Sequence, residues 1–254
     1  MKTLLIIGIG AGNPEHLTVQ AIHALNRTDV FFLLDKGSAK QKLMHLRRAI
    51  CERYIDHRRY RFVEAASPER DRGGDYTASV HALNQAKQRL LERLLDEQLA
   101  DGECGALLVW GDPSLYDSTL RIVQAIAAGG RELEYEVIPG ISSIQALAAS
   151  HKVALNRIGG PVEITTGRRL AQGQANTAGS VVVMLDGENA YQHLQAPDEH
   201  IYWGAYLGTE DEILIAGKLA DVAEQIEQVR QAARRANGWI MDTYLLQPPP
   251  GDED

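Results

Sequence analysis

The sequence contains little cysteine, no histidine pair with metal-binding spacing and no long apolar run. Its two cysteines, Cys51 and Cys104, are too few for a disulfide framework or a cysteine-rich zinc site, and we expect both to be buried thiols of a protein in a reducing cytosol. None of the eight histidines is paired at i, i+4 around a glutamate, as in zinc hydrolases, so no metal is indicated. Since nothing approaches the roughly 18 uninterrupted apolar residues of a membrane span, we expect no membrane partner.

Basic residues are also in the minority. The chain carries 26 lysines and arginines against 34 aspartates and glutamates, a formal charge of −8, which argues against steering toward nucleic acid and favours a compact ligand. Residues 1–12 have the lysine and the short apolar run of a signal peptide, but residues 13–16 offer no Ala-x-Ala cleavage pattern. We therefore expect a soluble, cytoplasmic protein.

The 254 residues suffice for one large or two modest domains, and we expect two. Short apolar runs alternate with segments of helical period, which is typical of parallel sheets with crossover helices and predicts the α/β class. We expect an N-terminal domain over 1–139, a C-terminal domain over 140–246 and a disordered, proline-rich tail over 247–254.

The pattern predicts the elements of both domains. In the first, we expect strands at 4–7, 30–34, 106–110 and 133–138 and helices at 14–26, 80–99 and 118–128. Residues 36–79 are polar and arginine-rich, and we interpret them as an insertion that interrupts the alternation. In the second domain, we expect helices at 142–149 and 218–235 and strands at 162–166, 180–185, 201–206 and 212–216, and residues 238–245 could add a final strand.

Three loops at the ends of predicted strands carry candidate binding residues. Gly8-Ile-Gly-Ala-Gly12 leads from a strand into a helix, and glycines at such a place let the backbone approach a ligand. Asn13 stands where the dinucleotide-binding pattern needs its third glycine. The alternative that this segment is only a tight turn therefore remains. Residues 110–117 and 138–143 form the other two loops. Open α/β sheets bind ligands at such strand ends, although Asp117 or Ser118 can equally cap the helix after the second loop, and Ser142 or Ser143 the helix after the third.

Four segments in order resemble the tetrapyrrole (corrin/porphyrin) methyltransferase family: Gly-Ile-Gly-Ala-Gly-Asn-Pro-Glu-His-Leu-Thr at 8–18, Gly-Asp-Pro-Ser-Leu-Tyr at 111–116, Ile-Pro-Gly-Ile-Ser-Ser at 138–143 and Leu-Gly-Thr-Glu-Asp-Glu at 207–212. The resemblance implies two α/β domains, with S-adenosylmethionine and a macrocyclic substrate in the cleft between them. The cofactor contacts that it implies are Gly10, Ala11, Trp110, Gly111, Asp112, Leu115, Ser142, Ser143, Met184 and Gly208. Met184 could equally fill the core at the end of a buried strand.

The middle of the chain, around Asp35 and from Trp110 to Arg121, resembles one branch of that family. This implies a methyltransferase that converts precorrin-5 to precorrin-6A by methylation at C-1 with release of acetate, in aerobic cobalamin biosynthesis. Methyl transfer from a sulfonium requires alignment and exclusion of water, and no nucleophilic side chain, so the lack of a Ser-His-Asp or Cys-His signature fits. Release of acetate requires a base and a donor, for which we name Asp35, Tyr116 and Asp117; helix capping is the alternative for each.

The implied substrate is a polycarboxylate, which favours arginine partners. We expect some of Arg47, Arg48, Arg58, Arg59 and Arg121 to bind it, the alternative being a solvated basic face. An apolar second sheet favours a homodimer.

Other functions stay open at this point. A methyltransferase of the same fold could act on another precorrin, on RNA or on a protein, although the acidic charge disfavours RNA. The glycine turn and Asp35 would also suit a nicotinamide-dependent reductase, and a non-catalytic tetrapyrrole or nucleotide binding module would need only the binding loops.

Overall fold

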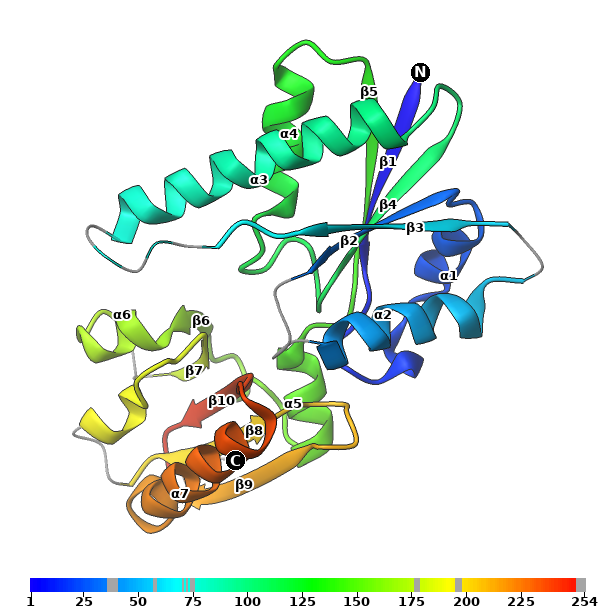
Figure 1. Ribbon diagram of the computed structural model, residues 1–254. Helices are drawn as coiled ribbons and strands as arrows, with labels where there is room; N and C mark the ends of the chain where they lie inside the picture. The colour runs from blue at the N-terminus through cyan, green and yellow to red at the C-terminus, as the bar shows by residue number, and fades with distance from the viewer. Residues whose placement is uncertain are drawn as a thin grey trace. The chain divides into compact units, whose positions relative to one another are not determined.

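The computed structural model describes residues 1–35, 41–56, 59–69, 71, 73, 76–175, 179–194 and 198–249. The chain divides into two compact units, Met1–Ser142 and Ser143–Asp254, and each contains a five-stranded sheet with helices (Figure 1). Of the tail expected at 247–254, Gln247 is the last residue of a strand, and residues 250–254 lie outside the described part of the chain.

The first unit is a parallel sheet with helices on both faces. Its strands are β1 (Lys2–Gly8), β2 (Val30–Asp35), β3 (Arg61–Ala66), β4 (Cys104–Val109) and β5 (Leu133–Ile138), in the spatial order β3-β2-β4-β1-β5. All of its strand pairs are parallel. Its helices are the 3₁₀ turn η1 (Pro14–His16), α1 (Val19–Asn26), α2 (Gln41–Tyr54), α3 (Tyr76–Gln98) and α4 (Thr119–Ala128).

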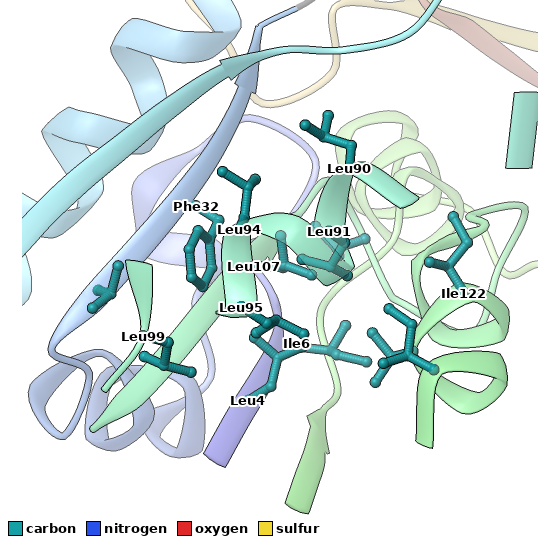
Figure 2. Close-up of a cluster of buried hydrophobic side chains, with 14 residues drawn as sticks. Leu4, Ile6, Phe32, Leu90, Leu91, Leu94, Leu95, Leu99, Leu107 and Ile122 are labelled. Carbon is teal, nitrogen blue, oxygen red and sulfur yellow. The ribbon is translucent and has the colours of Figure 1, made fainter. Parts of the chain in front are cut away.

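Alternate residues of each central strand serve opposite cores, because side chains of a strand alternate between faces. Leu5, Ile7 and Phe31 pack against α1 and α2 on one face. Leu4 and Ile6 pack on the other face against the leucines of α3 and against α4, as Figure 2 shows. A sheet that is apolar on both faces in this way needs helices on both sides.

The helix that follows β4 covers the opposite face from the helices that follow its two neighbours, β1 and β2. The loops at the carboxyl end of β4 therefore diverge from those on either side. In open α/β sheets, such a divergence leaves a crevice that binds ligands.

Interpreting residues 36–79 as an interruption of the alternation is wrong for the described part of that segment. It contributes α2 and the edge strand β3, which pairs with β2 along its whole length. The helix is hard to recognise because arginines interrupt its apolar positions, and only Ile50 and Cys51 of its described side chains are fully buried. Cys104, expected to be buried like Cys51, is only partly so.

The second unit has a mixed sheet, so the parallel arrangement expected from the alternation is wrong here. Its strands are β6 (Val162–Thr166), β7 (Ser180–Met184), β8 (His200–Ala205), β9 (Ile213–Lys218) and β10 (Asp242–Gln247), in the order β6-β7-β10-β8-β9. Only the β6–β7 pair is parallel among the pairs described. The helices are α5 (Ser143–His151), α6 (Gly167–Ala171), the 3₁₀ turn η3 (Ala190–His193) and α7 (Leu219–Asn237).

A buried polar network joins α7 to this sheet. Arg230 of α7 donates through Nε to Asp242 Oδ2 at 2.7 Å and through Nη2 to the carbonyl oxygen of Asp186 at 2.6 Å. Asp242 also accepts from the indole of Trp203, and Asp186 accepts from the hydroxyl of Tyr244. Burial alone would lower the pKa of Arg230, but the two carboxylates raise it, so the guanidinium stays charged.

The same network fixes the loop after β7. Asp186 Oδ2 accepts from the amide of Ala190 at 2.7 Å, and Oδ1 accepts from the amide of Glu188 at 3.1 Å. The loop begins directly after Met184, one of the residues expected to contact a cofactor. Among the helices of the described chain, none is long and apolar enough to cross a membrane.

Candidate functional site

The loops after β1 and β4 are joined by backbone hydrogen bonds. The amide of Ile9 donates to the carbonyl oxygen of Val109 at 2.9 Å, and the amide of Gly111 donates to that of Gly10 at 2.8 Å. Gly10 and Gly111 form an isolated antiparallel bridge, with φ of +80° and +69°. Both dihedrals lie in the left-handed region, which explains why glycine stands at these two positions.

The loop after β5 approaches the other two so closely that side chains are excluded. A Cβ atom on Gly140 would lie 2.1 Å from the carbonyl oxygen of Gly111, and one on Gly8 would lie 2.6 Å from the amide nitrogen of Gly140. The three glycine-containing loops predicted from the sequence thus meet at one end of the first sheet.

Asp112 fastens the second loop to the third. Its Oδ2 accepts from the amide of Gly140 at 2.8 Å, and its Oδ1 accepts from the amide of Ser114 at 2.8 Å and from the Ser114 hydroxyl. Burial opposes ionisation of this carboxyl, but these hydrogen bonds outweigh it and hold the pKa of Asp112 below its usual value. Asp112 is therefore an anion that holds the backbone of the second and third loops together.

The other predicted residues of this region differ in accessibility. Ala11 and Ser142 are buried, and Leu115 is partly buried. Trp110 packs partly against the apolar cluster under α1 and α2. Tyr116 is 42% exposed and has a φ of +51°, a conformation that is strained for a residue with a Cβ and that is found most often at functional sites.

A cavity of about 140 Å³ lies where β2 and β4 separate. The paired register of these strands ends at Phe32 and Leu107, and the next carbonyl of β4, that of Leu108, accepts instead from Arg47 Nε at 3.1 Å. The lining comes from both faces of the sheet and from the start of α4: Phe32, Leu34, Arg47, Ser67, Lys87, Leu91, Leu107, Leu108, Val109, Trp110, Asp117, Ser118, Thr119 and Ile122.

Two residues that the sequence suggested for different roles, Arg47 and Asp117, line this one cavity. Burial lowers the pKa of Arg47 to about 10, and the nearby charge of Asp117 opposes that shift, so the guanidinium is charged at neutral pH. Asp117 also accepts from the amide of Thr119 at 2.6 Å. Asp117 thus bonds the first amide of α4 from the position before Ser118, the N-cap residue, and it also lies in the cavity wall.

The structure does not bring the other arginines into this cavity. Arg48 forms an ion pair with Glu64 and lies 4.4 Å over the Phe62 ring. Arg59 and Arg121 are exposed, and Arg121 donates to the carbonyl oxygen of Asp117. Arg58 and the side chain of Asp35, the last residue of β2, lie outside the described part of the chain.

The second unit holds the remaining predicted residues at strand and helix ends. Ser143 begins α5, and its hydroxyl lies 3.2 Å from that of Thr243. Met184 ends β7 and is partly buried. Leu185 follows it with a φ of +54° and 65% exposure, and no pattern in the sequence indicated this strained, exposed leucine. Gly208 has a φ of +75° and donates its amide to Glu212 Oε2 at 2.7 Å.

Lys87 is a cavity residue that sequence reasoning missed, although a signal for it exists. The predicted apolar stripe of this helix includes Leu83 and Leu90, and Lys87 stands on the same stripe at i+4 and i−3 from them. A lysine on an apolar stripe must reach water or other polar groups with its ammonium. Its Nζ lies 3.5 Å from Ser118 Oγ.

Comparison with known proteins agrees with the arrangement of loops. The sequence model of the tetrapyrrole (corrin/porphyrin) methylases matches residues 3–223. The chain is 52% identical over 248 residues to a precorrin-6A synthase (deacetylating) of a Sinorhizobium species, across 97% of this chain and 95% of that protein.

Solved structures share the fold. A protein of Corynebacterium diphtheriae described as related to cobalamin synthesis matches with a TM-score of 0.82 and 36% identity, over 98% of this chain and 100% of that one. Uroporphyrin-III C-methyltransferase of Thermus thermophilus matches with a TM-score of 0.63 and 18% identity, over 99% and 98% of the two chains. The family resemblance expected from four short motifs is thereby confirmed, and the chain belongs to the tetrapyrrole (corrin/porphyrin) methylase family.

Proposed function

We propose that this protein is an S-adenosylmethionine-dependent C-methyltransferase that converts precorrin-5 to precorrin-6A, methylating C-1 and releasing acetate. The observation that carries the proposal is the match along almost the whole chain to the deacetylating Sinorhizobium enzyme. The joined glycine loops at the ends of β1, β4 and β5 support it, because they form a ligand-binding end of the sheet in a member of a methylase family.

The residues at this end fit S-adenosylmethionine by their chemistry. Gly10, Ala11 and Gly111 present backbone with little or no side chain, and Ser142 and Ser143 supply hydroxyls at a helix start. Such groups suit a nucleoside and an amino-acid moiety, both of which need hydrogen bonds and close backbone approach. The bound cofactor would supply an electrophilic methyl group. The chain's own task is to align the accepting carbon with that methyl group and to exclude water.

Loss of the acetyl group requires side chains that take part in the reaction, unlike methyl transfer. Water adds to the acetyl carbonyl carbon, the bond from that carbon to the macrocycle breaks, the electron pair stays with the macrocycle, and acetate leaves. A base must take a proton from the water, and a donor must polarise the carbonyl. We assign these roles to Asp117 and to Tyr116, its neighbour on an exposed, strained turn, and we keep Asp35 as a second candidate base.

The carboxylate arms of the substrate would pair with arginines. Arg59 and Arg121 are exposed and available to a large ligand, whereas Arg47 lies in a space too small for a macrocycle. We also propose a cytoplasmic homodimer that forms through the edge strand β9, on which Leu214 is 37% exposed.

The test is an anaerobic incubation with precorrin-5 and methyl-labelled S-adenosylmethionine, in which label in the macrocycle and free acetate are followed together. We expect one acetate for each methyl group transferred. Label without acetate would retain the methyltransferase and reject the deacetylating role. If neither signal arises from protein that binds S-adenosylhomocysteine, another precorrin, an RNA or a protein is the substrate, and a titration with NADPH tests the reductase alternative.

A further inference from the structure

The cavity between β2 and β4 is lined by the guanidinium of Arg47, whose side chain is half-buried. Arg47 reaches it from α2, and two of its donors are used: Nε on the carbonyl of Leu108, and Nη1 on the carbonyl of Leu43 at 3.0 Å. A guanidinium has five N–H donors, and within the described residues Nη2 has no hydrogen-bond partner. A desolvated cation is costly unless an anion or several hydrogen bonds compensate it.

The wall of the cavity compensates this charge only in part. Asp117 is near enough to influence Arg47 electrostatically, yet its carboxylate is not within ion-pair distance of the guanidinium and bonds the amide of Thr119 instead. Lys87 brings a second cation to the wall. Within the described residues Arg47 therefore has no ion-pair partner, and a small anion in the cavity would give it one.

The size of the cavity limits that anion. At about 140 Å³ it is well below the roughly 300–1,000 Å³ of pockets that hold drug-sized ligands. It has space for an ion of a few heavy atoms. Phe32, Leu34 and Leu91 make part of the wall apolar, which suits a methyl group beside a charged head.

We propose that this cavity binds the acetate released in the reaction, with Arg47 as the residue that holds its carboxylate. The proposal rests on the proposed function, since it needs a deacetylation step. Asp117 connects the cavity with the deacetylation step, because it lies in the cavity wall and is the base that we assign to the attacking water. When Asp117 takes that proton it becomes neutral, so the positive charge of the cavity is greatest at the moment acetate forms.

Direct binding is tested by titrating ¹³C-labelled acetate into the whole protein and following the acetate resonance by NMR. Wild type and Arg53→Met should bind acetate saturably; Arg53 is the matched control, because it lies on the same helix and pairs with Glu15 at the surface. Arg47→Met should bind at least about tenfold more weakly, as expected when a charged hydrogen-bonding partner is lost.

Arg47 also donates to two backbone carbonyl oxygens, so Arg47→Met could lose binding only because the protein is destabilised. A second, more conservative variant tests for that. Arg47→Lys keeps the charge but loses the planar two-donor fork, so we expect it to bind acetate several-fold more weakly than wild type does. Absence of saturable binding to wild type, or equal binding by wild type and both Arg47 variants, would overturn the proposal.

Turnover separates acetate from other carboxylates. In Arg47→Lys, methyl label should still enter the macrocycle while formation of acetate falls behind it, because the variant stabilises the forming carboxylate less. Added acetate should inhibit wild type more strongly than the variant. If the variant instead raises KM for the tetrapyrrole and keeps one acetate per methyl group, the cavity holds a side-chain carboxylate of the substrate, and the acetate assignment is wrong. Methylation by wild type without any acetate would reject the proposed function itself, and the inference with it.

Discussion

Replacing Arg230 by methionine should destabilise the protein strongly through the second unit. The two side chains of the Arg230–Asp242 pair are only 7% and 6% exposed, and they meet at 2.7 Å. Arg230→Met removes that contact and the bond to the carbonyl of Asp186, and it leaves Asp242 buried with only the indole of Trp203 as a described partner. Breaking one partner of a buried pair typically costs about 3–5 kcal/mol.

For a chain of this size, a loss of about 3–5 kcal/mol corresponds to a fall in Tm of roughly 6–20 °C. Circular dichroism during urea and thermal unfolding measures it. Arg234→Met is the matched control, because Arg234 is exposed one turn further along α7, and it should shift Tm by no more than a degree or two.

The double variant Arg230→Met/Asp242→Asn tests the cause. Neutralising the orphaned carboxylate should recover part of the lost stability, so the two substitutions should be strongly non-additive. Burial raises the pKa of Asp242 and Arg230 opposes this, so removal of Arg230 raises that pKa further. The loss in Arg230→Met should therefore shrink toward acid pH, where Asp242 is protonated. A loss below about 1 kcal/mol at pH 7, or additive effects in the double variant, would refute the reasoning.

Three further substitutions have defined outcomes. Burial raises the pKa of Glu199, whose Oε2 has no hydrogen-bond partner among the described residues, so stability is lost as pH rises. Glu199→Gln should therefore raise the free energy of unfolding in urea by about 1 kcal/mol at pH 8 and leave it unchanged at pH 4. The ion pair with Arg61 lowers the pKa of Glu103 to about 2, so the stability that this pair contributes is present above about pH 4.5 and is lost as pH falls. Glu103→Gln should lower the free energy of unfolding by up to about 1 kcal/mol at pH 7 and leave it unchanged near pH 2. An equal loss at both pH values would contradict this. Gly140→Ala should lower stability by roughly 1–3 kcal/mol and weaken S-adenosylhomocysteine binding in calorimetry, whereas Gly187→Ala, where an added Cβ meets nothing within 4 Å, should do neither.

The first sheet was largely predictable because its central strands are continuous apolar runs. Val30–Asp35 coincides with the predicted strand to within a residue, and Lys2–Gly8 contains the predicted residues 4–7. The edge strand β3 was missed because it is half exposed and lies in a cationic segment. In the second unit, the central place of β10 was not predictable, because the last strand of the chain pairs with strands far earlier in the sequence, and local pattern contains no information on such pairing.

The site was predictable to the level of loops and less so to the level of side chains. Glycines after apolar runs located the three loops, since parallel strands end together at one edge. The cavity could not be predicted, because Arg47 reaches it from one face of the sheet and Lys87 from the other, and only the early separation of β2 from β4 lets them meet. The roles proposed for Tyr116 and Asp117 stay predictions.

The mutual contact of Gly8, Gly111 and Gly140 has a consequence for how this protein can vary. Each glycine is required by the backbone of another loop, so a substitution at one cannot be offset by a side-chain change at its neighbours. Sequence change and engineering are therefore directed to side chains that this backbone contact does not involve. Substrate preference can then diverge between related enzymes while the backbone that joins the three strand ends stays the same.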